Sequence, residues 1–272
     1  MSGTDNNTGF YGKLPCRGDF LQRRAPLPFV DVWDAWLQEC LHVSKEQLQN
    51  AWLDTYLTGP VWRFVLDAGV CGDSSYAGIL VPSVDRVGRY FPLTIVTQLA
   101  AGHCPLDVAC GGSDWFEAAE TLVLDALEAE ALDIDAFDES VAQLRDPLAP
   151  EVVREAIALT RALSDSPFPL ETARWHVPIE SAQSLQRAIN ALAYRELSRG
   201  LKPLTLWWTE GSQTLGGSWL SVRGLPEASA FAAMLCGNWA ASGWTSVGAA
   251  VPLLATHRFA GDSETRSADE AL

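Results

Sequence analysis

Three apolar runs lie close together in the chain, and they restrict the fold more than any other feature of the sequence. They are VWRFVL (61–66), YAGILV (76–81) and FPLTIVTQLA (91–100). Gly, Pro, Asp and Ser separate them, which is typical of the turns that bound strands. Because consecutive strands joined by short connections pair as antiparallel neighbours, we predict that these runs lie side by side in one sheet.

Segments at helical spacing precede and follow these strands. Pro28 suits the first turn of a helix, and Ser44 with Gln47 forms a capping-box pattern that predicts the start of a second helix, which Gly59-Pro60 ends. Further helices are predicted from Ser113, near 136–145, over 150–164, over 182–199 with Gly200 at the C′ position, and from Pro226.

The remaining strands are predicted in GFYGKL near the N-terminus, in TARWHVPI (172–179), and in a hairpin of LTLWWTEG and GSWLSVRG. The order of elements is not a strict βαβ alternation. It predicts a single α/β domain over residues 9–260, in which helices cover a mixed, largely antiparallel central sheet. The polar segments 1–8 and 261–272 are predicted to be disordered tails.

The charge of the chain is concentrated in its middle third. The formal net charge is −15, and residues 101–165 hold 15 Asp and Glu against 3 Lys and Arg. Such acidity disfavours nucleic-acid binding. The acidic segment is either the solvated face of helices or a surface offered to a basic partner.

The sequence has no apolar run long enough to cross a bilayer, and no signal peptide is visible at its N-terminus. We therefore predict a cytoplasmic protein without direct membrane insertion.

No convincing catalytic or metal-binding set is present. Ser83 lies outside the strand-turn-helix context of an esterase serine, and Cys16 lies near Arg17, which could lower a thiol pKa. The histidines have no spacing that points to either residue, and His103, Cys104 and Cys110 do not match a zinc knuckle. Glycine-rich phosphate loops are also missing. We predict neither a cofactor nor a metal.

The loops that carry arginine are the most informative polar segments. Guanidinium groups suit carboxylate partners or pairing within the protein. The candidate partner-binding residues are Arg17, Asp19, Arg63, Ser83, Asp85, Arg86 and Arg89. Two interpretations stay open: Asp19 and Asp85 pair with these arginines and lock the loops, or the loops form a docking surface.

The same segments resemble the TagF family, accessory proteins of bacterial type VI secretion systems. The resemblance is dense over residues 9–100, in the segments GFYGKLPCRGDF, WDAWLQ, GPVWRFVL and GILVPSVDRVGRYFPLT. It continues to about Trp244 through LTLWWTEG and GLPEASAFAAMLCGNW. The chain departs from the family at Phe10, where Trp is common, and at Cys16, where Ser is common.

The resemblance implies a three-layer α/β/α sandwich and a cytoplasmic, non-enzymatic regulator that represses type VI secretion after translation. It also implies a partner, the forkhead-associated scaffold protein of the system. Two alternatives stay open: a hydrolase with Cys16 or Ser83 as nucleophile, and a structural subunit of the secretion apparatus.

Overall fold

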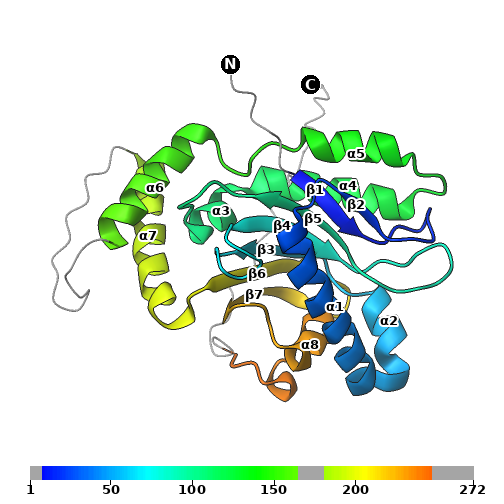
Figure 1. Cartoon of the computed structure of the whole chain (residues 1–272). Helices are drawn as coiled ribbons and strands as arrows, with labels where there is room; N and C mark the ends of the chain where they lie inside the picture. The colour runs from blue at the N-terminus through cyan, green and yellow to red at the C-terminus, as the bar shows by residue number, and fades with distance from the viewer. Residues whose placement is uncertain (1–7, 165–180, 247–272) are drawn as a thin grey trace, which may run out of the picture.

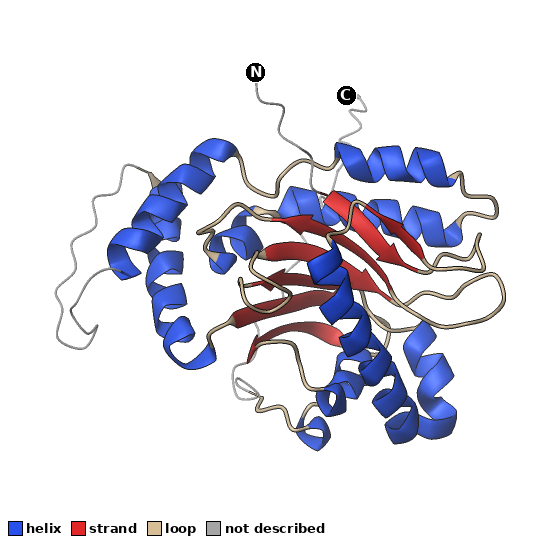
Figure 2. Cartoon of the chain, in the orientation of Figure 1, coloured by secondary structure: helices blue, strands red, loops and turns tan. Residues whose placement is uncertain are grey.

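The computed structural model of the chain describes residues 8–164 and 181–246. Seven strands in this part of the chain form one sheet, in the order β2-β1-β5-β4-β3-β6-β7 (Figures 1 and 2). The strands are β1 (Thr8–Gly12), β2 (Leu21–Arg23), β3 (Trp62–Leu66), β4 (Tyr76–Val81), β5 (Leu93–Gln98), β6 (Leu204–Gly211) and β7 (Gly216–Arg223). The three apolar runs are therefore confirmed as adjacent strands.

All six pairings between these strands are antiparallel. The sheet is thus antiparallel where a mixed sheet was predicted, and the one parallel contact among the described residues is an isolated bridge between Phe10 and Arg24. Short connections explain this arrangement for β3, β4 and β5, because they leave no room for a parallel crossover.

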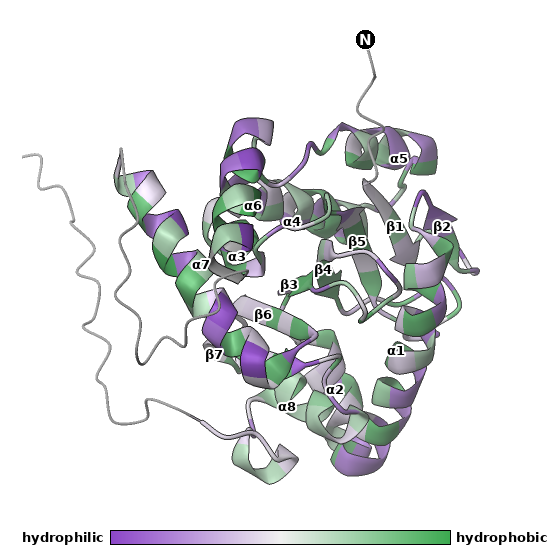
Figure 3. Cartoon of the chain, turned by 60° about the vertical axis from the view of Figure 1, so that its left-hand side comes forward, coloured by the Kyte–Doolittle hydropathy of each residue, from purple (hydrophilic) through white to green (hydrophobic). Residues whose placement is uncertain are grey.

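The central strands are buried along their whole length. Every residue of β3 and β4 is buried, and Figure 3 colours these strands mainly as hydrophobic. Because successive side chains of a strand point to opposite faces, Phe64 joins one apolar cluster while its neighbour Val65 joins another. The sheet therefore contributes to two separate hydrophobic cores.

Different helices pack against the two faces. The first cluster includes residues of α1 (Leu27–Leu48), α2 (Trp52–Leu57) and α8 (Phe231–Cys236). The second includes residues of α3 (Pro105–Gly111), α4 (Ser113–Glu128) and α5 (Ile134–Gln143). At the left of Figure 1, α6 (Pro150–Ser164) and α7 (Ala182–Leu201) pack against each other.

Aromatic rings dominate the contact between α1 and the sheet. The ring centroid of Trp33 lies 4.7 Å from that of Phe64 and 5.8 Å from that of Trp207, and Trp33 is fully buried. Its indole N–H donates to the hydroxyl of Thr94 at 2.9 Å, which satisfies the one polar group that the buried ring carries.

Two predicted helix boundaries are wrong. Ser44 does not start a second helix, because α1 continues to Leu48; the Ser44 hydroxyl instead donates to Leu41 O at 3.1 Å and accepts from the Trp52 indole at 3.0 Å. The next helix begins at Trp52, after a 3₁₀ turn over Gln49–Ala51. Likewise, α7 continues past Gly200 to Leu201.

The other predicted helices and the C-terminal hairpin are present, and the helix predicted from Pro226 is a 3₁₀ turn (Ala228–Ala230) followed by α8. The sequence did not predict α3 or β2, and a third 3₁₀ turn spans Ala240–Ser242. The predicted strand 172–179 and tail 261–272 lie outside the described residues, as does segment 1–7, whereas Thr8 opens β1. Within the described ranges, no helix is both long and apolar enough to cross a bilayer.

Replacing Trp33 tests the packing of α1. We expect Trp33→Ala to lower the free energy of unfolding by about 3–5 kcal/mol, because it leaves a cavity among fully buried rings. Trp219→Ala is the matched control: its side chain is 54% exposed on β7, so a loss below about 1 kcal/mol is expected. Denaturant unfolding measures both values, and equal losses would contradict this view of the core.

Candidate functional site

A buried ion pair lies at the end of the sheet where the β4–β5 loop projects. Lys13 directly follows β1, and its Nζ donates to Oδ2 of Asp85 at 2.5 Å. The two side chains are 4% and 0% exposed. A buried charge is costly unless it is paired and hydrogen-bonded, so the environment of Asp85 decides whether this arrangement is stable.

Asp85 satisfies both carboxylate oxygens within its own loop. Its Oδ1 accepts the backbone N–H groups of Val87 at 3.0 Å and Arg89 at 2.9 Å, and its Oδ2 also accepts Nε of Arg89 at 2.7 Å. A turn closes between Asp85 O and Gly88 N at 3.0 Å, and Gly88 has the positive φ of 83° that favours glycine there. The carboxylate is therefore the centre of the loop.

These contacts fix the charge state of Asp85. Burial alone would raise the pKa of this carboxyl group, but hydrogen bonds from Lys13, from Arg89 and from the Val87 backbone together hold the pKa well below its usual range. The group is ionised at neutral pH, where it neutralises Lys13.

Ser83 connects the same loop to Lys13 and Tyr56 by hydrogen bonds. Its hydroxyl donates to Lys13 O at 2.7 Å, and its backbone N–H and C=O bond the Tyr56 hydroxyl at 3.0 and 2.9 Å. Ser83 is 3% exposed, and burial raises the pKa of Tyr56 despite the bond to Ser83. This geometry gives no support to Ser83 as a nucleophile, because its hydroxyl is buried and bonded to a backbone carbonyl.

The arginine-bearing loop that contains residues 17–19 contacts the β4–β5 loop through the main chain and through Arg89. The N–H of Arg86 donates to Arg17 O at 2.9 Å. Arg89 Nη2 donates to Gly18 O, and it lies 4.0 Å from the exposed carboxylate of Asp19. Two segments that are distant in the sequence therefore form one surface.

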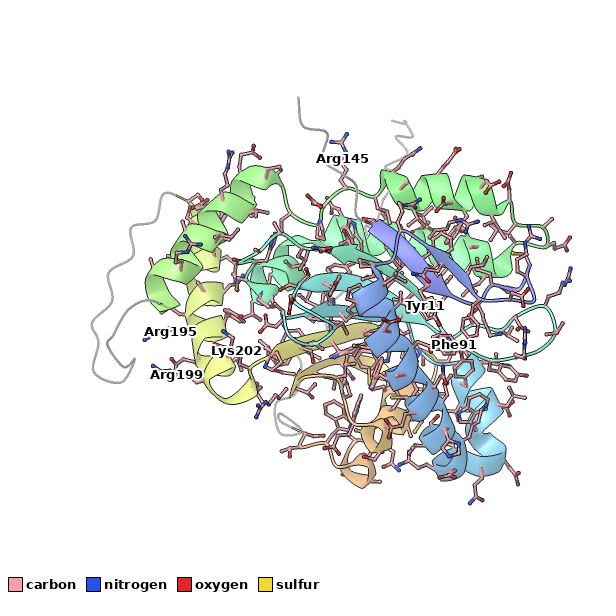
Figure 4. The ribbon with its side chains drawn as sticks, in the orientation of Figure 1. Tyr11, Phe91, Arg145, Arg195, Arg199 and Lys202 are labelled. Carbon is pink, nitrogen blue, oxygen red and sulfur yellow. The ribbon has the colours of Figure 1, made fainter. Side chains whose placement is uncertain are left out.

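Aromatic rings adjoin this surface. Phe20 is 46% exposed; its ring stacks on Tyr11 with centroids 5.7 Å apart and meets Phe91 edge-on at 4.8 Å. Figure 4 labels Tyr11 and Phe91. Their ring centroids lie 5.9 Å apart. The ammonium of Lys13 lies 4.6 Å from the Phe20 ring centroid, so the buried ion pair and the ring support each other.

We call residues 17–20 and 86–89 together the arginine surface. A hollow of about 520 Å³ at this place is lined by Arg17, Gly18, Asp19, Leu21, Arg86, Val87 and Arg89. Val87 is 64% exposed beside it, and the side chains of Arg17 and Arg86 are exposed.

Six of the seven predicted site residues thus meet at one end of the sheet, either on the arginine surface or directly beneath it. Arg63 does not: it lies on β3, is 6% exposed, and pairs with Glu120 at 2.6 and 2.9 Å and with Glu210 at 3.1 Å. The hydrogen bond to Glu120 raises the pKa of Arg63. Sequence reasoning missed Lys13, although a lysine inside the apolar stretch FYGKLP needs a partner when buried.

The acidic middle third lies mostly on exposed helix faces, as Glu117 and Asp125 of α4 do. Asp107 is an exception: it is 4% exposed, and its Oδ1 accepts Asn190 Nδ2 at 2.7 Å. Burial raises the pKa of this carboxyl group. This placement leaves both interpretations of the acidic segment open.

The candidate metal ligands do not lie at the arginine surface, whereas the candidate nucleophiles adjoin it: Cys16 directly precedes Arg17, and Ser83 lies beneath the loop. Cys104 is buried, with its Sγ near Asn190 O at 3.8 Å, and Cys16 is half-buried. In the part of the chain that the structure covers, no group of His, Cys, Asp and Glu is arranged to hold a metal ion. His176 and His257 lie outside that part.

The sequence and the fold match a class of bacterial secretion-associated proteins. Residues 9–144 match the model of the TagF N-terminal domain, described as type VI secretion system-associated. The chain belongs to the TagF family.

A solved structure extends this likeness beyond the matched domain. The crystal structure of PA0076 from Pseudomonas aeruginosa PAO1 is 36% identical in sequence, with a TM-score of 0.70 over 90% of this chain and 98% of that one. A search of curated proteins finds no match. The arginine surface lies inside the matched family domain.

Replacing Asp85 tests the role of the buried pair. We expect Asp85→Asn to be less stable than the wild type at neutral pH, because Lys13 then loses its counter-charge. The folded-state pKa lies below the unfolded value of about 3.9. The stabilisation is therefore complete above about pH 4 and is lost as the pH falls toward the folded-state pKa.

Urea unfolding of both proteins across this pH range measures the effect. The difference between them should narrow as the pH falls below about 4. Asp19→Asn, at an exposed carboxylate of the neighbouring loop, is the control and should leave stability unchanged. A stability difference that stays constant with pH would contradict the proposed charge state of Asp85.

Proposed function

We propose that this TagF-family protein represses type VI secretion after translation by binding a component of the secretion apparatus, the forkhead-associated scaffold protein. Binding takes place in the cytoplasm, requires no cofactor and involves no nucleic acid. The observation that carries the proposal is the arginine surface, which a buried ion pair holds in place inside the matched family domain.

The surface suits binding because its shape is fixed before a partner arrives. Loops ordered by their own hydrogen bonds lose less conformational entropy when they associate. The bonds around Asp85 provide this order, while Arg17, Arg86 and Val87 stay exposed. The predicted alternatives of loop locking and docking are thus combined: Asp85 locks the loop, and its neighbours face outward.

The wider architecture belongs to the same proposal. We infer a three-layer α/β/α sandwich that forms a single domain over residues 9–260. The two apolar clusters, to which opposite faces of the sheet contribute, support the layered arrangement. The hydrolase alternative receives no such support for Ser83, which is buried, and its other candidate nucleophile, Cys16, is half-buried.

Capture of the purified scaffold protein by the full-length chain tests this function. We expect the wild type to bind the scaffold, and its overproduction to lower secretion by a bacterium with an active type VI system. Arg17→Ala combined with Arg86→Ala should weaken both effects, because it removes two exposed guanidinium groups. Arg145→Ala, at an exposed arginine of the α5–α6 connection, is the control and should change neither.

Two results would contradict the proposal. A wild-type chain that neither captures the scaffold nor lowers secretion would show that it is not this repressor. Loss of repression in Cys16→Ala, with scaffold capture intact, would favour the hydrolase alternative instead.

A further inference from the structure

We propose that the arginine surface binds an acidic segment of a partner protein. Arg17 and Arg86 would pair with its carboxylates, and Val87 would pack against an apolar side chain of the same segment. This inference rests on the proposed function, namely that the chain acts by binding a protein, and it specifies the chemistry of the partner.

The first argument is that two arginines of the predicted site already have ion-pair partners within the protein, whereas two others do not. Arg63 is committed to Glu120 and Glu210, and Arg89 to Asp85. The side chains of Arg17 and Arg86 are exposed and have no ion pair or hydrogen bond within the described residues. Two guanidinium groups are therefore available for bidentate bonds to carboxylates.

The second argument is their placement. The bond from Arg86 N to Arg17 O, at 2.9 Å, makes the two residues neighbours on adjacent segments of chain. A Cβ added at Gly18 would lie 3.9 Å from Cγ1 of Val87, so the apolar side chain lies against the same loop. The hollow of about 520 Å³ opens among these residues.

The third argument is charge. The arginine surface holds Arg17, Arg86 and Arg89 against the single aspartate Asp19, on a chain whose formal net charge is −15. A local positive patch on an acidic protein attracts carboxylates at short range, whereas the rest of the surface repels a polyanion such as nucleic acid. The patch therefore fits a short acidic segment better than a uniformly negative partner.

The fourth argument is the apolar content of the patch. Val87 and Phe20 are 64% and 46% exposed beside the charged groups. A patch in which apolar groups adjoin arginine is typical of protein interfaces, where Arg and aromatic residues are enriched. The expected partner segment thus carries both carboxylates and at least one apolar side chain.

Fluorescence anisotropy with the full-length chain tests the inference. The probe is a fluorescein-labelled peptide in which Glu alternates with Leu and Ser, and the matched peptide has Gln in place of every Glu. We expect the Glu peptide to bind at least about tenfold more tightly at low salt, and this advantage to shrink at high salt, because exposed ion pairs are screened.

Charge reversal locates the binding. Arg17→Glu combined with Arg86→Glu should abolish the preference for the Glu peptide. Arg145→Glu is the single-site control, and it changes a residue that Figure 4 shows far from Tyr11 and Phe91. Circular dichroism and thermal unfolding of each variant confirm that the fold is retained.

Several outcomes would overturn the inference: no binding of the Glu peptide, equal binding of both peptides, or equal losses of Glu-peptide affinity in the double variant and in Arg145→Glu.

Capture of the scaffold protein distinguishes a failure of the inference from a failure of the proposed function. If the wild type captures the scaffold and the double charge-reversal variant captures it equally well, the acidic-segment inference is wrong while the proposed function stands. If the wild type does not capture the scaffold, the proposed function is wrong and the peptide measurement still decides the inference.

Discussion

The ring of Phe64 on β3 lies against the bare backbone of Gly78 on β4, and much of the aromatic packing under α1 surrounds that contact. The two residues are directly opposite in the sheet, and a Cβ on Gly78 would lie 2.4 Å from Cζ of Phe64. Because no side chain occupies this place, the ring of Phe64 can also meet Trp33 at 4.7 Å and Trp207 at 5.3 Å. One glycine thus lets three strands and a helix share a continuous aromatic layer.

The same sheet places the arginine surface. Since β1 pairs with β5 in antiparallel register, the end of β1 at Gly12 lies beside the start of β5, where Leu93 follows Pro92. The chain that leaves β1 and the chain that enters β5 therefore emerge at the same end of the sheet. Lys13 and Asp85 meet there, although 72 positions separate them in the sequence.

Sequence patterns predicted the elements whose boundaries depend on local chemistry. The runs that became β3, β4 and β5 are apolar and bounded by turn residues, so local signals were enough. Ser44 shows where such signals fail: it has the local pattern of an N-cap, yet Trp52 holds its hydroxyl inside a continuous α1. A tertiary contact overrode the local preference, and a short strand such as β2 has too few residues to produce a pattern.

In the candidate site too, local sequence signals predicted some features, and tertiary contacts determined the others. The sequence predicted that arginines and aspartates of two loops belong together, and six of the seven residues do converge. It could not predict that Arg63 pairs with Glu120 and Glu210, because those partners come from α4 and β6. Nor could it predict Lys13 as the partner of Asp85, since the pairing depends on the register between β1 and β5.

The long-range pairing of Lys13 with Asp85 has a further consequence for any partner that recognises the arginine surface. Neither loop alone contains the arginine surface: one part follows β1 and the other lies between β4 and β5, and the buried pair joins them where the sheet brings these strands together. A nascent or misfolded copy carries the same arginines without their arrangement. If the arginine surface binds its partner as we propose, that partner recognises only folded molecules, and the repression then follows the amount of folded protein and not the amount synthesised.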